Sequence, residues 1–418
     1  MSTPPLNTPD PVAPATPAAA TVDGGTPADA VPPEVALNRR KRRRRLLILL
    51  GVLVTLIGVV SCLLVRYLLR PEPLPDILTA GVNYPPHYLY TIEGVDEPMG
   101  VGLSPDGRKL YVTEVSGERH IKIFASDSGK LIRAFDPPAS TPAERAPVYL
   151  TVDALGRVYV TDRLQHTIAI YNGDGDYLDT VLDSKTTLSG YVLRQAGRLP
   201  EASIYYYNIN MSGVQYKLSG ESEWATAPPP TQTTWSPLGI SIAPDGRLLV
   251  TDVGGQESRV LVYPAVLTHI ATRAVMPLEP TTFGTLGSGD GQLAFPNDVV
   301  VDSKGRFYVI DSNNGRITGW DINQQYSFSF GKGAGTGSLN LPHGAFLDGK
   351  DRLFVTDAVD HNVKVYNVAG DRPVFLYAFG EEGQQIGQFN YPNDIVLSSD
   401  GKLYVADRGN NRIQVWSY

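Results

Sequence analysis

One segment occurs six times between residue 98 and residue 418, and this repeat constrains the fold more than any other feature. Its last copy, residues 391–418, reads YPNDIVLSSDGKLYVADRGNNRIQVWSY. In every copy a proline opens the first apolar run, and an acidic residue ends the second. The opening prolines are Pro98, Pro147, Pro237, Pro296, Pro342 and Pro392. The acidic residues are Glu114, Asp162, Asp252, Asp311, Asp357 and Asp407. This regular spacing predicts that each copy folds into one repeated unit.

The sequence of one copy predicts three antiparallel strands. In the last copy, apolar residues alternate with polar or small ones over residues 394–397 and 403–406, with Asp400-Gly401 between them. Because an Asp-Gly pair readily adopts the positive φ angles of a tight reversal, the two runs predict a hairpin. A second turn at residues 408–411 leads into a third run. Where the spacing is longer, as at residues 374–379, a fourth strand follows, and four short strands in about 45 to 50 residues are typical of a β-propeller blade.

The repeat resembles a named family, the NHL repeat. The resemblance is carried by Pro296-Asn297-Asp298-Val299, by residues 305–309 with Asp311, by residues 313–317 and by the spacer at 283–292. It extends over nearly all of residues 88–418. The resemblance implies an all-β propeller, but it does not imply one function, since NHL propellers include binding modules and a few enzymes.

The number of blades follows from the spacing of the prolines, which is 49, 90, 59, 46 and 50 residues. The interval of 90 is nearly two units long, and residues 191–195, 203–208 and 214–218 within it are interpreted as three strands without the acidic residue. We therefore predict seven blades, one of them degenerate. Six blades with an inserted hairpin is the alternative, and the family resemblance favours six.

The N-terminal part predicts a tail and a membrane anchor. Residues 1–38 are rich in Pro, Ala and Thr, which is typical of a disordered tail. Seven consecutive cations at residues 39–45 precede twenty uncharged, mostly apolar residues at 46–65, long enough to cross a bilayer. Cationic flanks stay in the cytoplasm, so the tail is expected inside the cell and the rest outside, in a single-pass protein of the cell membrane. The basic run would also attract anionic lipid headgroups.

An alternative interpretation of the anchor involves its cysteine. Residues 59–62 fit the short pattern that precedes a lipid-modified cysteine in bacterial lipoproteins. The long preceding tail and the apolar residues 63–65 favour an uncleaved signal-anchor. Cys62 is the only cysteine of the chain, so a disulfide within the propeller is excluded.

Residues 66–86 contain spaced prolines and predict a semi-extended stalk before the propeller, which occupies residues 87–418. The segment 88–92 predicts one strand without a neighbour in the sequence. The last copy has only three strands, so we expect residues 88–92 to supply its outer strand and close the ring.

The repeated acidic residues are interpreted as structural. An acid before a turn rich in Gly and Asn commonly accepts backbone N–H bonds that would otherwise be unpaired. Two of them are also expected to pair with an arginine five residues later: Asp311 with Arg316, and Asp407 with Arg412.

The residues that follow the opening prolines are the better candidates for a binding site. The first strand of each blade lines the central channel, so these residues are expected at one channel mouth. They are Met99, Val148, Leu238, Asn297, His343 and Asn393. Three consecutive blades thus present Asn297, His343 and Asn393, with Asp298 and Asp394 one position later. These five residues are the candidate ligand-binding set, and the alternative is that they are ordinary polar residues at a wet mouth.

An enzyme is the alternative function. Some NHL propellers are amidating lyases whose zinc is held by three histidines, but here only His343 occupies such a position. A mixed set of His343, Asp298 and Asp394 would suit zinc or calcium, in a lyase-like or lactonase-like enzyme. No catalytic residue can be assigned, and no other cofactor is expected.

Charge argues against nucleic acid as a partner. Residues 1–70 hold 9 Lys and Arg and 4 Asp and Glu, which leaves 27 and 39 in the rest of the chain. This net charge of −12 repels phosphate. The sequence therefore predicts a membrane-anchored propeller that binds an extracytoplasmic protein, glycan or small ligand.

Overall fold

The structure is a computed structural model that describes residues 33–69, 85–137, 141–197, 204–210, 213–218, 220–228, 234–265 and 279–418. The chain divides into two compact units, Met1–Leu68 and Leu69–Tyr418. Residues 1–32 of the predicted tail and residues 70–84 of the predicted stalk lie outside the described residues.

The first unit contains one long helix, α1 (Pro33–Leu69). Its segment Arg44–Arg66 has a mean hydropathy of 2.9 over its most apolar window and is long and apolar enough to cross a membrane. The helix begins well before residue 46, where the predicted span starts. It includes the basic run and the last six residues of the segment predicted to be disordered, because nothing in residues 33–45 breaks a helix after Pro33 at its first position.

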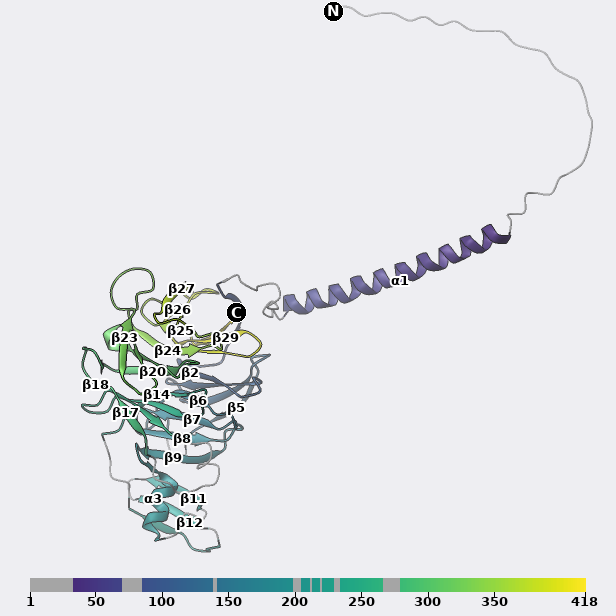
Figure 1. Ribbon diagram of the computed structural model, residues 1–418. Helices are drawn as coiled ribbons and strands as arrows, with labels where there is room; N and C mark the ends of the chain where they lie inside the picture. The colour runs from purple at the N-terminus through teal and green to yellow at the C-terminus, as the bar shows by residue number, and fades with distance from the viewer. Residues whose placement is uncertain are drawn as a thin grey trace, which may run out of the picture. The chain divides into compact units, whose positions relative to one another are not determined.

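The second unit is an all-β propeller, as predicted, and six blades can be traced through its described residues (Figure 1). The inner strands, in order from blade 1 to blade 6, are β2 (Pro98–Leu103), β6 (Pro147–Val152), β14 (Pro237–Ile242), β20 (Pro296–Val301), β24 (Pro342–Leu347) and β28 (Pro392–Leu397). The second strands are β3 (Lys109–Glu114), β7 (Val158–Asp162), β15 (Leu248–Asp252), β21 (Phe307–Asp311), β25 (Arg352–Asp357) and β29 (Lys402–Asp407).

The third strands are β4 (Ile121–Ala125), β8 (Thr167–Tyr171), β16 (Arg259–Tyr263), β22 (Arg316–Trp320), β26 (Asn362–Asn367) and β30 (Arg412–Ser417). The outer strands of blades 1 to 5 are β5 (Leu131–Phe135), β9 (Tyr177–Asp183), β17 (Thr281–Phe283), β23 (Tyr326–Phe330) and β27 (Val374–Phe379). Strands within each blade are antiparallel, and the opening proline of every inner strand pairs with the acid that ends the second strand, as Pro392 pairs with Asp407.

The outer strand of blade 6 comes from the other end of the domain. Strand β1 (His87–Ile92) pairs antiparallel with β30, with His87 opposite Ser417 and Ile92 opposite Ile413. Ile92 is fully buried between blades 6 and 1. This pairing joins the two ends of the propeller within one sheet and closes the ring.

The prediction of seven blades is wrong, because the long interval between Pro147 and Pro237 holds one blade and an insertion. After β9 come β10 (Thr186–Thr187) and a helix, α3 (Leu188–Gln195). A separate three-stranded sheet follows, ordered β11 (Ile204–Asn210), β12 (Gly213–Leu218) and β13 (Ala225–Ala227).

The residues predicted to form the first strand of the degenerate blade, 191–195, are helical. Leu188, Val192 and Leu193 recur at helical spacing and are buried against Val214 and other apolar residues of the insertion. The Thr187 side chain caps the helix by accepting a hydrogen bond from the Gly190 N–H. The insertion thus has an apolar core of its own; β10 extends the sheet of blade 2 at its outer edge, and the three-stranded sheet stays separate from the ring.

The blades are held together by apolar contacts between neighbours. One cluster joins blade 4 to blade 5 and includes Val300, Tyr308, Ile310, Leu353 and Val355. Period-two alternation puts these side chains on the faces that meet between blades. The inner strands of successive blades lie side by side, and β28 lies beside β2, so the six strands surround one channel.

Candidate functional site

The repeated acidic residues form the scaffold around the site. All six are buried. Each accepts a hydrogen bond from the backbone N–H of a residue one or two positions before its opening proline. Five also form an ion pair with a Lys or Arg of the third strand. The two pairs expected from the sequence, Arg316 with Asp311 and Arg412 with Asp407, are both present, each with 2.7 Å between Nε and the carboxylate.

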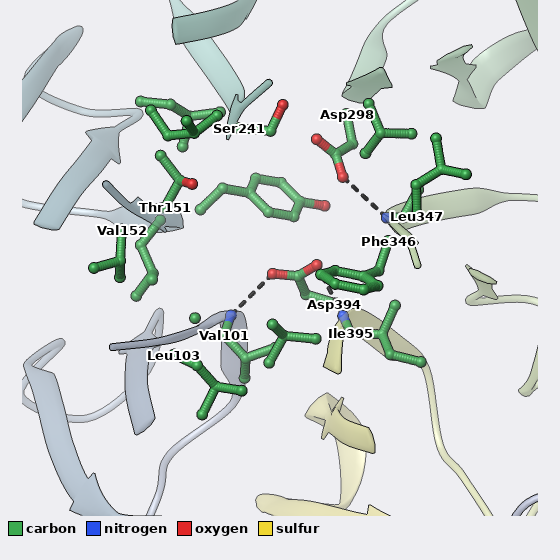
Figure 2. A pocket seen from close by; sticks show the side chains of 18 of the residues that line it. Val101, Leu103, Thr151, Val152, Ser241, Asp298, Phe346, Leu347, Asp394 and Ile395 are labelled. Carbon is green, nitrogen blue, oxygen red and sulfur yellow. Dashed lines mark hydrogen bonds between the residues drawn. The ribbon is translucent and has the colours of Figure 1, made fainter. Parts of the chain in front are cut away.

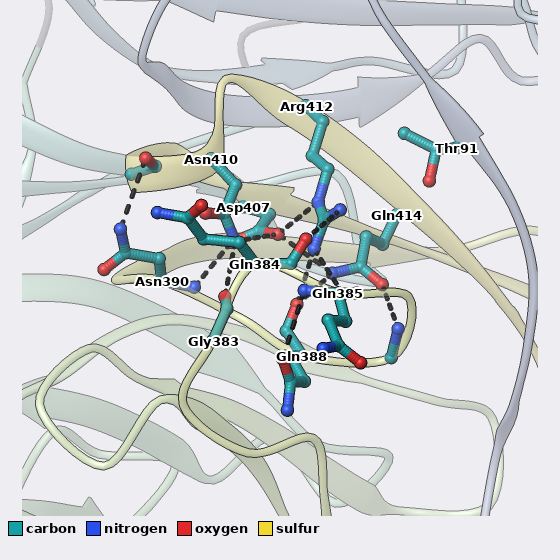
Figure 3. Close-up of polar contacts among 12 residues, drawn as sticks. Thr91, Gly383, Gln384, Gln385, Gln388, Asn390, Asp407, Asn410, Arg412 and Gln414 are labelled. Carbon is teal, nitrogen blue, oxygen red and sulfur yellow. Dashed lines mark hydrogen bonds and ion pairs between the residues drawn. The ribbon is translucent and has the colours of Figure 1, made fainter.

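Blade 6 shows how such an acid fixes the loop that precedes its blade (Figure 3). Asp407 accepts hydrogen bonds from the Asn390 N–H at 2.7 Å, from Gln414 Nε2 at 2.9 Å and from the Arg412 guanidinium. Arg412 in turn donates to the carbonyl oxygens of Gln384 at 3.0 Å and of Gln385 and Gln388 at 2.8 Å. The carboxylates and their cations therefore compensate each other inside the scaffold.

The three polar residues that follow the opening prolines lie at the end of the channel where the inner strands begin. Asn393 is 1% exposed and Asn297 is also buried, whereas His343 is half-buried. His343 Nδ1 lies 2.7 Å from Asn393 Oδ1, and Asn393 Nδ2 donates to the Met99 carbonyl at 2.9 Å and to the Tyr149 hydroxyl at 3.2 Å. The structure thus brings His343 and Asn393 together, and within the described residues Asn297 makes no hydrogen bond to either.

The protonation of His343 follows from these contacts. Because Asn393 Nδ2 donates to a carbonyl, its Oδ1 faces the histidine, and Nδ1 must carry the proton that is donated to it. Burial lowers the pKa of His343, which keeps the ring neutral at pH 7. The pair is a closed hydrogen-bonded unit, and it links blades 5 and 6 at this end of the channel.

Asp298 and Asp394 occupy the next position of their strands and act between blades. Asp298 Oδ2 accepts the N–H of Ala345 in blade 5 at 2.9 Å, and Asp394 Oδ2 accepts the N–H of Val101 in blade 1 at 2.9 Å. The other oxygen of each carboxyl group accepts the N–H of the following residue. Asp298 is 5% exposed and Asp394 is 6% exposed.

Burial dominates the electrostatics of both carboxyl groups. It raises the pKa of Asp298 to about 7, although the two backbone N–H groups act in the opposite direction. Burial also raises the pKa of Asp394 well above its usual range, and the charge of Asp298 raises it further. The two acids therefore interact unfavourably when both are ionised, and no cation of the described residues is close enough to pair with either.

These two acids line a cavity of about 330 Å³ in the channel (Figure 2). Figure 2 shows both carboxyl groups pointing into it, with Thr151, Ser241 and Phe346 among its walls. Most of the wall comes from the last three residues of the inner strands, so the cavity extends toward the end of the channel where these strands finish. Asn297, His343 and Asn393 do not line it.

Tyr149 is a site residue that the sequence reasoning missed. It occupies the same strand position as Asp298 and Asp394, is 3% exposed and lines the cavity. Burial, followed by the nearby charges of Asp394 and Asp298, raises its pKa well above the usual value, so the hydroxyl keeps its proton. The signal was the strand position itself, which holds Gly100, Tyr149, Gly239, Asp298, Gly344 and Asp394 in blades 1 to 6.

Of the weak metal candidates, Asp298 and Asp394 line the cavity and His343 does not. Among the residues that the structure describes, no three His, Cys, Asp or Glu side chains lie close enough to hold one metal ion. The cavity combines two carboxyl groups and a phenol with residues that mostly have apolar side chains.

Comparison with known proteins identifies the repeat. The family model described as NHL repeat matches residues 293–320 and 389–416, which lie in blades 4 and 6. A human protein, NHL repeat-containing protein 3, is 46% identical over 43 residues, which are 10% of this chain and 12% of that protein. The chain therefore matches only a small part of the length of this relative.

Solved structures that resemble this chain include a streptogramin B lyase, with 14% identity and a TM-score of 0.48 over 79% of this chain and 98% of the lyase. Virginiamycin B lyase from Staphylococcus aureus has 13% identity and a TM-score of 0.46 over 77% of this chain and 94% of that one. A chain of a nidogen/laminin complex has 14% identity and a TM-score of 0.41 over 68% and 79%. Similarity at this level carries no conclusion about ligand or activity.

Proposed function

We propose that this chain, which belongs to the NHL-repeat β-propeller proteins, is a membrane-anchored binding module that takes up a small ligand in its channel. The observation that carries the proposal is the cavity of about 330 Å³, which lies within the size range of small-molecule sites. Most residues of its wall have apolar side chains, and Asp298, Asp394, Tyr149, Thr151 and Ser241 supply polar groups. Such a combination provides affinity through burial and orientation through hydrogen bonds.

The proposed location of the module rests on the charges that flank the apolar segment of α1. Seven consecutive Lys and Arg residues at 39–45 precede the apolar segment, whereas Arg66 and Arg70 are the cations nearest its other end. This asymmetry favours a cytoplasmic N-terminus and an extracytoplasmic propeller. The ligand would then reach the cavity from outside the cell.

Binding is tested on the full-length chain in lipid nanodiscs by thermal shift against small apolar and amphiphilic molecules, including cations, anions and neutral compounds. Thr151→Trp is the matched variant, since Thr151 lines the cavity and the indole would fill it. Saturable stabilisation of the wild type by at least one class, lost in Thr151→Trp, is the expected result. No stabilisation by any class would reject the channel as a ligand site.

Orientation is tested by labelling intact cells with a membrane-impermeant maleimide. In a Cys62→Ser background, Asp290→Cys places a thiol on an exposed propeller loop, and Thr8→Cys places one in the N-terminal tail. We expect the propeller thiol to react in intact cells and the tail thiol to react only after lysis. The reverse pattern would reject the extracytoplasmic location.

A further inference from the structure

Asp298 and Asp394 are two buried carboxyl groups that have no cationic partner among the described residues. Each oxygen accepts one backbone N–H, at 2.9 Å from Ala345 and Val101 and at 2.7 and 2.8 Å from the residue that follows each acid. In the described part of the chain, neither carboxyl group is in contact with a Lys, Arg or His side chain. Buried carboxyl groups elsewhere in this propeller, such as Asp311 and Asp407, are paired with an arginine. The two channel acids therefore differ from most of the buried repeat acids of the same molecule.

The space beside these acids is suited to an organic group. The cavity wall carries Leu103, Val152, Ile242, Phe346, Leu347 and Leu397. Most of these side chains are half-buried, so they have apolar surface left to bury against a ligand. The Tyr149 hydroxyl accepts a hydrogen bond from Asn393 Nδ2, and no acceptor for its own proton lies within hydrogen-bonding distance among the described residues.

We propose that the channel cavity binds a small primary amine, with its ammonium group between Asp298 and Asp394 and its apolar body against the cavity wall. This inference rests on the proposed function. An ammonium group has three N–H donors and no acceptor, and each carboxyl oxygen has a lone pair left after its one backbone contact. A ligand with a carboxylate group would be repelled by the two acids when they are ionised. A neutral alcohol could form hydrogen bonds with them but could not compensate their negative charge.

The titration of the two acids adds a second expectation. Burial raises the pKa of Asp298 to about 7 and raises that of Asp394 well above the usual range, so the empty cavity holds protons near neutral pH. The groups that face the pair are each other and Tyr149, which stays protonated. A bound ammonium group favours the ionised carboxylates, so amine binding at pH 6 to 7 should release protons.

The experiment compares phenethylamine with phenethyl alcohol, which has nearly the same shape and no charge. Binding is measured calorimetrically to full-length protein in phosphatidylcholine nanodiscs, with empty nanodiscs as the blank. At pH 6.5, in two buffers of different ionisation enthalpy, the amine is expected to bind about tenfold more tightly than the alcohol, as charge-assisted hydrogen bonds would give. The buffer dependence should show net proton release for the amine only.

Five variants locate the effect. Asp298→Asn with Asp394→Asn should abolish the preference for the amine and the proton release, while Asp290→Asn, an exposed acid in a loop, should change neither. Thr151→Trp should abolish binding of both compounds. The two single Asn variants, each expected to reduce the preference, keep the test decisive if the double variant does not fold.

The outcomes separate this inference from the proposed function. Equal binding of amine and alcohol, lost in Thr151→Trp, would reject the amine and leave the channel as a ligand site. An amine preference that persists in every Asn variant would reject the two acids as its cause. If neither compound binds, the amine proposal is rejected, and the wider thermal-shift survey decides whether the channel binds any ligand.

Discussion

Blades 4 and 6 are joined to the next blade by a carboxyl group, whereas blades 1, 2 and 5 are joined by a hydroxyl group. Thr161 Oγ1 in blade 2 donates to the Leu238 carbonyl of blade 3 at 2.7 Å, and Thr356 Oγ1 in blade 5 donates to the Asn393 carbonyl of blade 6 at 2.9 Å. Thr113 makes the corresponding bond from blade 1. Blades 4 and 6 have Ile310 and Ala406 at this position, and there Asp298 and Asp394 reach the next blade instead.

This difference shows that two kinds of side chain can form the hydrogen bond to the next blade, and that their electrostatic costs differ. A hydroxyl can be buried with two hydrogen bonds at little cost, whereas a buried carboxyl group must take up a proton or find a cation. The acids also need space, which glycines of the preceding blade supply. A Cβ atom at Gly344 would lie 2.4 Å from Asp394 Oδ1, so a larger residue there would displace the acid. We call Asp298 and Asp394 the carboxyl joints, and Thr113, Thr161 and Thr356 the hydroxyl joints. The carboxyl joints contribute charged groups to the wall of the cavity.

The largest expected effect is a pH dependence of the free energy of unfolding that arises at Asp298 and Asp394. Burial raises the pKa of Asp298 from 3.8 to about 7, so the folded state binds more protons than the unfolded state between these values. Stability from this group is therefore complete below about pH 4 and falls as the pH rises toward 7, by on the order of 4 kcal/mol in total. Asp394 contributes in the same direction.

The measurement is the free energy of unfolding from pH 5 to 8 for the wild type, Asp298→Asn and Thr356→Val. Other buried acids shift the wild-type curve as well, so the comparison uses differences from the wild type. The cost of Asp298→Asn should shrink as the pH rises, because the wild type loses stability that asparagine cannot lose. The cost of Thr356→Val should be constant. Parallel curves for both variants would contradict the distinction between the joints.

The second prediction concerns the joint at which the ring closes. Asp394→Ala removes the acceptor of the Val101 and Ile395 N–H groups and leaves them buried, which should cost about 3 kcal/mol at pH 5. Asp290→Ala, in an exposed loop, is the control and should cost less than about 0.5 kcal/mol. Chemical denaturation of the full-length chain in nanodiscs checks both. A loss for Asp394→Ala as small as that of the control would show that the carboxyl joint contributes little.

The repeated blades and their strands could be predicted from the sequence, because the opening prolines, the alternation of apolar and polar residues and the turn residues are local features. The repeated acids and the two ion pairs to Arg316 and Arg412 follow from spacing along one chain segment. The number of blades could not be predicted by dividing the chain length, since the insertion between blades 2 and 3 supplies its own core. Thr187 before residues 188, 192 and 193 was the available signal for its helix.

The candidate site was predicted only in part, because the register of the inner strands shifts just after the opening proline. In blade 6 the pairing shifts between Pro392 and Ile395, and the other inner strands shift in the same region. A bulge of this kind changes which side chain faces the channel, and period-two alternation cannot locate it. Asp298 and Asp394 were selected as neighbours of the residues after proline, whereas Tyr149 at their own position was not selected. Their partners lie in other blades, which no local pattern reveals.

A smaller effect is expected at a hydroxyl joint. Thr356→Val keeps the shape of the side chain but leaves the Gly344 N–H and the Asn393 carbonyl without the hydroxyl between them. The expected cost is about 1 to 2 kcal/mol, less than at the carboxyl joint. Thr356→Ser retains the hydroxyl and should restore most of the loss. If the valine and serine variants are equally destabilised, the methyl group and not the hydroxyl holds this joint.

The smallest expected effect comes from converting one joint into the other. Asp298→Gly gives blade 4 the residue found in blades 1, 3 and 5, and Ile310→Thr supplies the hydroxyl found at the joints of blades 1, 2 and 5. Each change alone should destabilise the ring, the first by loss of an acceptor for the Ala345 N–H and the second by burial of an unpaired hydroxyl. Together they should recover about 1 kcal/mol relative to the sum of the single changes, as a double-mutant cycle would report. Additive costs would mean that the two joints are not interchangeable, and that the channel acids are retained in blades 4 and 6 for a reason other than joining strands.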